Sequence, residues 1–171
     1  MVILITGASH TGKTVLAQRL LEKYKFPYLS IDHLKMGLIR SKYTNLTPYS
    51  DDREMTAYLW PIVREMIKTV IENKQNLIVE GCYIPADWHS DFTDEYMEHI
   101  KCFCLVMSED YIRSHFDDIR KHACAAEARL DDSALNPDTM ICDNLHYLAL
   151  KDRYQAEYIL IDKDYSFDIT I

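Results

Sequence analysis

The segment from residue 2 to residue 24 constrains the fold more than any other part of this chain. It reads VILIT, then GASHTGKT, then VLAQRLLEKY. The first run is continuously apolar and predicts a short buried strand, whereas the last run repeats its apolar residues at helical spacing. The segment therefore predicts a strand, a glycine-containing loop and a helix, in that order.

The loop has the pattern Gly-x-x-x-x-Gly-Lys-Thr. Its two glycines let the backbone curl so that N–H groups point inward at phosphate groups, and the following helix adds its positive end. In this pattern Lys13 reaches the β- and γ-phosphates and Thr14 ligates Mg²⁺. The loop therefore predicts a nucleoside triphosphate site, made of Gly7, Ala8, Ser9, His10, Thr11, Gly12, Lys13, Thr14 and Val15.

Strands and helices are predicted to alternate along the rest of the chain. Four more apolar runs predict strands, at 28–31, 76–84, 102–107 and 158–162. Helical patterns lie between them, at 33–43, 50–73, 108–130 and 136–154. In the helix at 50–73, Ser50 is expected to cap the start and Pro61 to cause a kink or a restart. The alternation predicts a three-layer α/β fold, with a five-stranded parallel sheet and helices on both faces.

Composition narrows the range of partners. The chain has 171 residues, 19 basic and 27 acidic, with a formal net charge of −8, which disfavours broad binding to nucleic acid. No apolar run approaches the length of a membrane span, and the start lacks the features of a signal peptide. Five cysteines without a CxxC pattern fit a reducing cytoplasm. We therefore expect a single cytoplasmic domain, monomeric or homodimeric, that binds small molecules.

The chain resembles the small-molecule P-loop kinases. The resemblance is carried by GASHTGKT, SIDHLKMGLIR and LIVEGCYIP, and it extends over nearly the whole chain as an ordered pattern. The group includes nucleotide, shikimate and gluconate kinases, chloramphenicol phosphotransferase and zeta-toxin-like kinases. The last two stretches also resemble proteins assigned as adenylate or 2-phosphoglycerate kinases. The resemblance implies one P-loop kinase domain that uses ATP and Mg²⁺, with an acceptor-binding segment at about 33–75 and a lid at about 113–136.

The resemblance also implies roles for two carboxylates. Asp32, just past the second predicted strand, would face the acceptor, orient its hydroxyl and take its proton. The same residue could instead cap the following helix. Glu80, at the end of the third predicted strand, would hold Mg²⁺ through water, and a structural ion pair is the alternative.

Further residues are implied around the acceptor and the migrating phosphoryl group. Arg40 would hold an anionic group of the acceptor, although it could be a plain surface arginine. Gly81 would allow close approach of backbone or substrate, and Tyr83 would line the cleft or simply pack. Arg120 and Arg129 would act from the lid, unless that segment is only a solvated charged helix. The loop at 162–167 would contact adenine, with Asp162 and Lys163 as candidates.

Three functions compete on this sequence. The leading hypothesis is an ATP- and Mg²⁺-dependent kinase that transfers the γ-phosphoryl group to a hydroxyl or phosphate oxygen of a small molecule. The alternative is a nucleotide-dependent binding or regulatory module with weak ATP hydrolysis. A kinase that modifies RNA is disfavoured by the net charge and the short chain. A GTPase is disfavoured because the sequence has no Asn/Thr-Lys-x-Asp motif.

Overall fold

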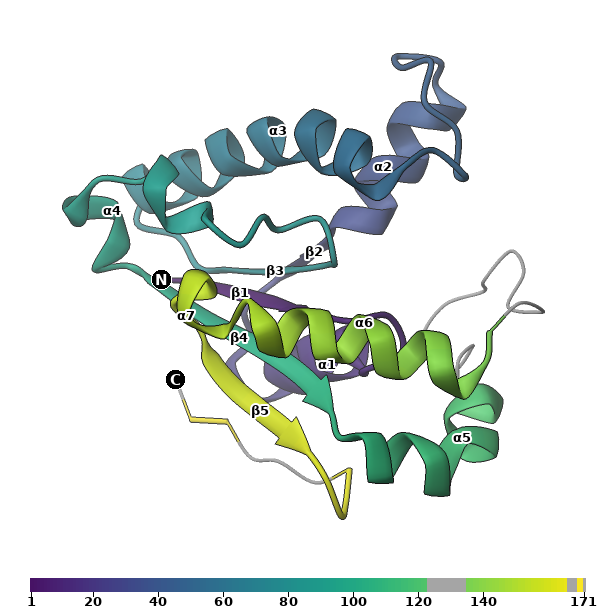
Figure 1. Ribbon diagram of the computed structural model, residues 1–171. Helices are drawn as coiled ribbons and strands as arrows, with labels where there is room; N and C mark the ends of the chain where they lie inside the picture. Colours follow the sequence, from purple (N-terminus) through teal and green to yellow (C-terminus); the bar gives the residue numbers. More distant parts are fainter. Residues whose placement is uncertain (123–134, 166–168, 171) are drawn as a thin grey trace.

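A five-stranded parallel sheet forms the centre of the molecule (Figure 1). The structure is a computed structural model that describes residues 1–122, 135–165, 169 and 170. The strand order is β2-β3-β1-β4-β5, and every neighbouring pair is parallel. The strands are β1 (Val2–Gly7), β2 (Tyr28–Ser30), β3 (Leu77–Glu80), β4 (Ile100–Met107) and β5 (Glu157–Ile161). The predicted parallel α/β sheet is confirmed.

Helices cover both faces of this sheet. They are α1 (Lys13–Tyr24), α2 (Ile31–Arg40), α3 (Asp52–Glu72), α4 (Asp94–Met97), α5 (Glu109–His122), α6 (Pro137–Ala149) and α7 (Lys151–Tyr154), with a 3₁₀ turn at Trp88–Asp91. Successive side chains of β1 enter different cores, as a strand requires. Ile3 and Ile5 pack with α1, whereas Val2 and Leu4 pack with α3. None of the described helices is long and apolar enough to cross a membrane.

Helix α3 differs from expectation at two points. It runs through Pro61 as one helix of 21 residues, so the predicted restart there is wrong. Pro61 lies on the exposed side of α3, where water can satisfy the carbonyl that its ring leaves free, while Leu59 and Val63 keep the buried face packed. The cap is Asp51 rather than Ser50, because the Asp51 carboxylate accepts hydrogen bonds from the N–H groups of Arg53 and Glu54.

The topology gathers the chemically active residues at one edge of the sheet. β1 lies between β3 and β4, so the phosphate loop leaves the sheet at its centre. Glu80 pairs with Ile5 of β1 on one side and with Ser30 of β2 on the other. Helix α2 begins directly after Ser30, which places Asp32 in its first turn. Ligands of open parallel sheets bind at this carboxyl edge.

Candidate active site

The phosphate loop closes around one carbonyl group. The Ala8 carbonyl accepts hydrogen bonds from the Thr11 hydroxyl and from the Lys13 ammonium group, both at 2.8 Å. Lys13 is only 9% exposed, and its side chain therefore lies folded against the loop. A bound phosphate can compete for this ammonium group, because a charged hydrogen bond is stronger than one to a neutral carbonyl.

The start of α1 is open to an anion. The first four N–H groups of a helix have no carbonyl partner within it. In α1 the residue at the cap position is Gly12, which supplies no side-chain hydrogen bond, and the first turn has no acidic residue. The positive end of α1 is therefore compensated by neither a cap side chain nor a carboxylate, as expected of a phosphate-binding helix.

Gly12 also makes room for a tyrosine from the far end of the chain. Its φ is +82°, and a Cβ placed on it would lie 1.5 Å from the Tyr165 hydroxyl. That hydroxyl donates to the Thr11 carbonyl at 3.1 Å, and Arg19 lies over the Tyr165 ring. Sequence reasoning pointed to this loop but named Asp162 and Lys163, which are both exposed. The aromatic residue was the signal that it missed.

Thr14 and Glu80, the two residues expected to hold Mg²⁺, lie next to each other. The Thr14 hydroxyl lies 3.3 Å from Oε2 of Glu80, and Glu80 is buried at 2% exposure. Carboxylate and hydroxyl oxygens are the hard ligands that Mg²⁺ prefers. The described part of the chain has no group of three or more His, Cys, Asp or Glu side chains suited to a metal ion. Magnesium at Thr14 and Glu80 would therefore need oxygens from the nucleotide and from water.

Asp32 belongs to a network that the sequence did not reveal. Lys35 lies 2.6 Å from Oδ1 of Asp32 and donates to the Tyr83 hydroxyl at 2.9 Å. Burial opposes the charge on Lys35, but the hydrogen bonds to Asp32 and Tyr83 outweigh it and raise the pKa of Lys35. Burial also raises the pKa of Tyr83, which stays a neutral phenol. The sequence signal that could have revealed this pair is the i,i+3 spacing of Asp32 and Lys35, which puts two side chains on one face of a helix.

Cys82 lies within electrostatic range of both the phosphate loop and the start of α2. Burial raises the pKa of its thiol to about 11, and the charges of Lys13, Asp32, Asp52 and Lys35 also act on it. The lysine of the phosphate loop and the carboxylate of α2 are therefore both near this one side chain. Because its thiol is protonated at neutral pH, the Cys82 side chain is uncharged and does not act as a nucleophile.

Because Gly81 has no side chain, the start of α2 can lie close to it. Its N–H donates to the Ile5 carbonyl at 3.1 Å, and a Cβ on Gly81 would meet the Ile31 side chain at 3.0 Å. The close neighbour is thus the first residue of α2, immediately before Asp32. The helix cap is Ser30, which makes no side-chain hydrogen bond to the helix, so Asp32 is not the cap residue.

The predicted arginines lie apart from this network. Arg40 is exposed in the last turn of α2, and eight residues of helix separate it from Asp32 by about 12 Å. Arg120 is exposed in the last turn of α5, while Arg113, about two turns earlier on the same helix face, pairs with Glu109 and Asp138. Arg129 lies outside the described residues. The structure therefore joins Lys35, rather than Arg40, to Asp32.

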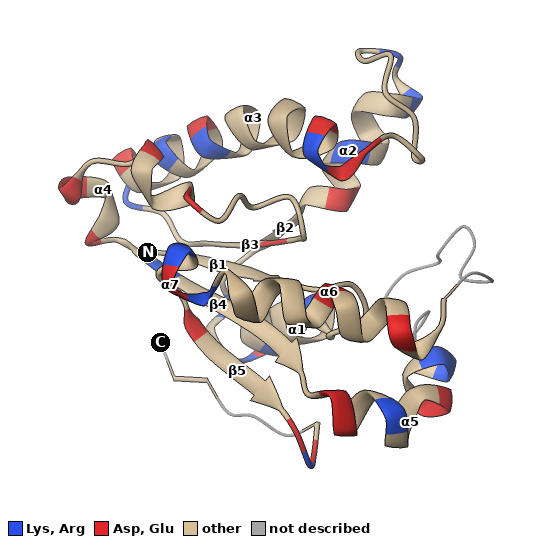
Figure 2. Cartoon of the chain, viewed as in Figure 1, with Lys and Arg blue, Asp and Glu red and all other residues tan. Residues whose placement is uncertain are grey.

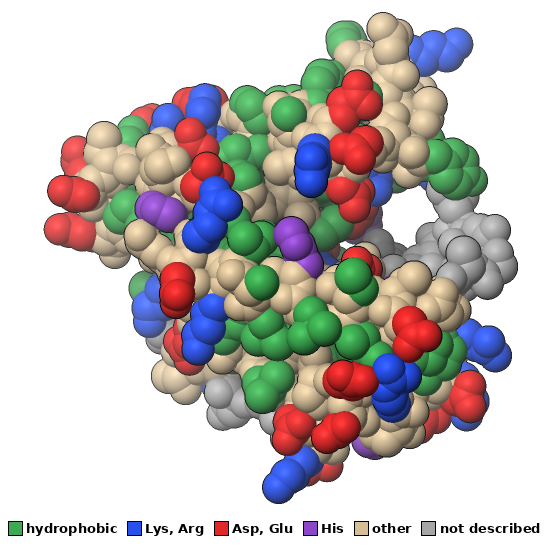
Figure 3. All heavy atoms as spheres, viewed as in Figure 1, with side chains coloured by type: hydrophobic (Ala, Val, Ile, Leu, Met, Phe, Trp, Pro, Cys, Tyr) green, Lys and Arg blue, Asp and Glu red, His purple; other side chains and the backbone are tan. Residues whose placement is uncertain are grey.

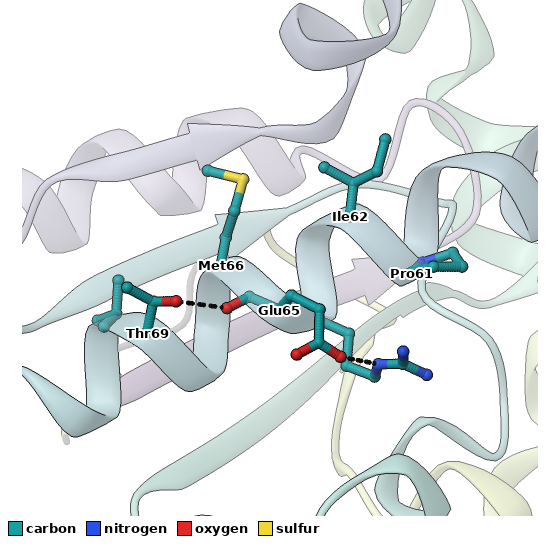
Figure 4. A pocket seen from close by; sticks show the side chains of 7 residues that line it. Pro61, Ile62, Glu65, Met66 and Thr69 are labelled. Carbon is teal, nitrogen blue, oxygen red and sulfur yellow. Dashed lines mark hydrogen bonds and ion pairs between the residues drawn. The ribbon is translucent and has the colours of Figure 1, made fainter.

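A shallow pocket on α3 is separate from the site. Ile62 and Met66 project from the same side of the helix, one turn apart, whereas Glu65, which pairs with Arg64, projects from another side (Figure 4). It lies along the second half of α3, which leads toward the amino end of β3. The phosphate loop, Asp32 and Glu80 are at the opposite, carboxyl edge of the sheet. The pocket is therefore not part of the candidate active site.

Among the comparisons with known proteins, only the comparison with solved structures finds matches, and these support the fold. No protein-family model matches the chain, and no curated protein sequence matches it. A Chloroflexus aurantiacus protein described as a kinase is 20% identical, with a TM-score of 0.53 over 94% of this chain and 84% of its own. Shikimate kinase from Bacteroides thetaiotaomicron is 19% identical, with a TM-score of 0.53 over 95% and 86%. A chain of the Pnkp1/Rnl/Hen1 RNA repair complex is 13% identical, with a TM-score of 0.55 over 91% of this chain and 46% of its own.

These similarities, with the parallel sheet and the phosphate loop, define the architecture. The chain has the α/β fold of the small-molecule P-loop kinases, as its sequence pattern predicted. At these levels of identity the likeness extends to the fold. The chemistry has to be argued from the residues of the site.

Proposed function

We propose that this protein is a kinase that transfers the γ-phosphoryl group of ATP to a small-molecule acceptor, with Mg²⁺ as cofactor. One observation carries the proposal: Thr14 of the phosphate loop contacts Glu80 at the end of β3, and Glu80 pairs in the sheet with Ser30, directly before the first turn of α2 that holds Asp32. A phosphate-binding loop and a candidate base at the same edge of the sheet are the arrangement that transfer between two bound substrates requires. The kinase fold supports the same reaction class.

Each residue has a defined task in the proposed reaction. The loop N–H groups and the start of α1 hold the phosphates, and Lys13 offsets their charge. The acceptor oxygen forms a bond to the γ-phosphorus as the bond from that phosphorus to the β,γ-bridging oxygen breaks. ADP leaves with the electron pair, and Asp32 receives the acceptor proton. Thr14 and Glu80 would hold Mg²⁺, which when bound neutralises charge on the phosphates.

The Glu80→Gln variant tests the proposed magnesium site. The amide keeps the size of the side chain but removes its charge, so we expect the Mg²⁺ concentration for half-maximal activity to rise about tenfold to a hundredfold. Magnesium titration of ADP release measures this. Glu22→Gln, at an exposed position of α1, is the matched control and should leave the midpoint unchanged. An unaltered midpoint in Glu80→Gln would remove Glu80 from the metal site.

The remaining assignments belong to the same proposal. The acceptor would bind along the segment at about 33–75, and a lid at about 113–136 would bring Arg120 and Arg129 to the migrating phosphoryl group. The acidic net charge of −8 supports small-molecule partners rather than nucleic acid. A cytoplasmic location is supported by the free thiols of Cys82, Cys102, Cys104 and Cys142.

A screen of ADP release separates this proposal from its alternative, a regulatory module with weak ATP hydrolysis. MgATP is supplied alone and then with a panel of hydroxyl compounds, acids and phosphate esters. A kinase should release ADP much faster with one acceptor class and should form an equal amount of phosphorylated product. Tight ATP binding with slow hydrolysis that no compound accelerates would favour the module.

A further inference from the structure

We propose that the acceptor is an uncharged polyol with two neighbouring hydroxyl groups, which Asp32 and Lys35 recognise together. This inference rests on the proposed kinase function and names the acceptor class for that same site. It is carried by the geometry of the carboxylate–ammonium pair and by the charges around it.

The pair offers one acceptor and one donor side by side. Lys35 has three N–H donors, of which one reaches Oδ1 of Asp32 at 2.6 Å and one reaches the Tyr83 hydroxyl at 2.9 Å. The third N–H remains for a ligand. Oδ2 of Asp32 has no hydrogen bond from any residue that the structure describes. The Lys35 side chain is 13% exposed and packs over the Tyr83 ring, so its position is set by the protein before a ligand arrives.

Two adjacent hydroxyl groups match this arrangement. The reacting hydroxyl donates its proton to Oδ2 of Asp32, as the proposed transfer requires. The neighbouring hydroxyl oxygen accepts the remaining N–H of Lys35. A compound with a single hydroxyl uses only half of the pair and leaves a mostly buried ammonium donor unsatisfied, which costs binding energy.

The charge of Lys35 is already compensated, which argues against an acidic acceptor. Recognition of a carboxylate or phosphate favours an uncompensated cation, usually the forked guanidinium of an arginine. Lys35 lies against Asp32 instead, and Arg40 is exposed about two turns away on α2. The pair as a whole therefore offers polarity without net positive charge.

Further carboxylates face the same space. The Tyr147 hydroxyl of α6 donates to the Cys82 carbonyl at 3.3 Å, so this side of α6 looks onto the cleft. Asp143 is one turn earlier on the same side and nearer the carboxyl edge of the sheet. Asp52 begins α3 across from it. Burial and the charge of Asp52 both raise the pKa of Asp143, which places the two carboxylates within electrostatic range.

The charge-coloured views agree with this arrangement. Acidic residues lie on α2, at the start of α3 and on α6 (Figure 2). The surface is hollowed between the α2–α3 side and α6, and acidic side chains gather along the rim on the α2–α3 side (Figure 3). Lys13 belongs to the phosphate loop, and on the acceptor side the ammonium group of Lys35 stands against the carboxylates of Asp32, Asp52 and Asp143. A negatively charged acceptor would be repelled here, whereas a neutral polyol would not.

A matched acceptor panel tests the inference. ADP release from MgATP is measured with glycerol against propane-1,3-diol, with propane-1,2-diol against propan-1-ol, and with glucose against gluconate. We expect the neutral member with neighbouring hydroxyls to give at least tenfold higher kcat/KM in its pair. Preference for an acid, an amine or an isolated hydroxyl would overturn the inference, as would a panel in which no vicinal diol exceeds its partner.

Failure of the inference and failure of the kinase function give different results. If an acid or a phosphate ester accelerates ADP release, the kinase function stands and the polyol is excluded. If no acceptor of any class accelerates it while MgATP still binds, the kinase function fails as well.

The Lys35→Met variant tests the role of the ammonium group. It keeps the length of the side chain and removes the donor, so we expect KM for the preferred diol to rise about tenfold to a hundredfold. The KM of a single-hydroxyl compound should change much less, which a merely structural role of Lys35 would not explain. Lys101→Met, at an exposed position near the amino end of β4, is the control. Equal losses with both kinds of acceptor, at unchanged MgATP affinity, would contradict the assignment.

Discussion

Replacement of Asp32 by Asn is expected to lower kcat for phosphoryl transfer about 10²- to 10⁴-fold and to leave MgATP binding almost unchanged. The amide has nearly the same shape as the carboxylate but cannot accept the acceptor proton. The nucleotide contacts of Lys13 and the start of α1 do not involve Asp32. The loss should therefore appear in the chemical step and not in binding of the donor.

Two measurements check this result. Steady-state ADP release with the preferred acceptor gives kcat, and binding of MgATP is measured separately by calorimetry. Asp152→Asn, at an exposed position of α7, is the matched control and should retain full activity. If Asp32→Asn kept kcat while only KM for the acceptor rose, Asp32 would position the acceptor without acting as its base.

The fold could be predicted because its signals are local. The apolar runs of buried parallel strands and the helical repeats between them placed all five strands in the correct order along the chain. The phosphate loop could be predicted in the same way, because its glycines, lysine and threonine lie in one continuous stretch of the sequence. The strand order in the sheet depends on long-range pairing, and the sequence carried no signal for it.

The acceptor side was harder to predict because it depends on where a short helix begins. Helix α2 starts at Ile31, so Asp32 and Lys35 lie about one turn apart on the same helix face and meet directly. The expected helix began at residue 33, after Asp32, and gave no reason to pair them. Boundaries of this kind shift by a few residues with tertiary packing. Here the first residue of α2, Ile31, packs against Gly81 so closely that a Cβ on Gly81 would lie 3.0 Å from its side chain.

Contacts between distant segments were likewise invisible in the sequence. Tyr165 reaches the phosphate loop across more than 150 residues, and the Tyr147 hydroxyl reaches the Cys82 carbonyl across 65. Burial raises the pKa of Tyr165 to about 12, so it remains a neutral donor to the Thr11 carbonyl. These links depend on the tertiary arrangement, in which β1 lies between β3 and β4, and β5 lies beyond β4. The sequence therefore allowed candidate site residues to be named, but not the contacts between them.

Gly7→Ala is expected to lower the stability of the protein strongly, although it adds only one methyl group. Gly7 has a φ of +136°, which L side chains rarely adopt, and a Cβ there would lie 2.2 Å from the Leu105 carbonyl oxygen. Leu105 belongs to β4 and pairs with Gly7 in the centre of the sheet, so its backbone cannot move aside without breaking the ladder. We expect the free energy of unfolding to fall by about 3 kcal/mol or more, since backbone strain and a steric conflict combine.

The same substitution at Gly37 is the control, because nothing lies within 4 Å of a Cβ placed there and the residue is inside α2. Gly37→Ala should raise the free energy of unfolding by about 0.5–1 kcal/mol, since alanine favours a helix and restricts the unfolded chain. Denaturant unfolding followed by circular dichroism measures both variants. The melting temperature of Gly7→Ala should fall by roughly 6–12 °C. Similar stability of the two alanine variants would show that the phosphate loop can leave β1 without a glycine, because backbone strain and the conflict with Leu105 distinguish Gly7 from Gly37.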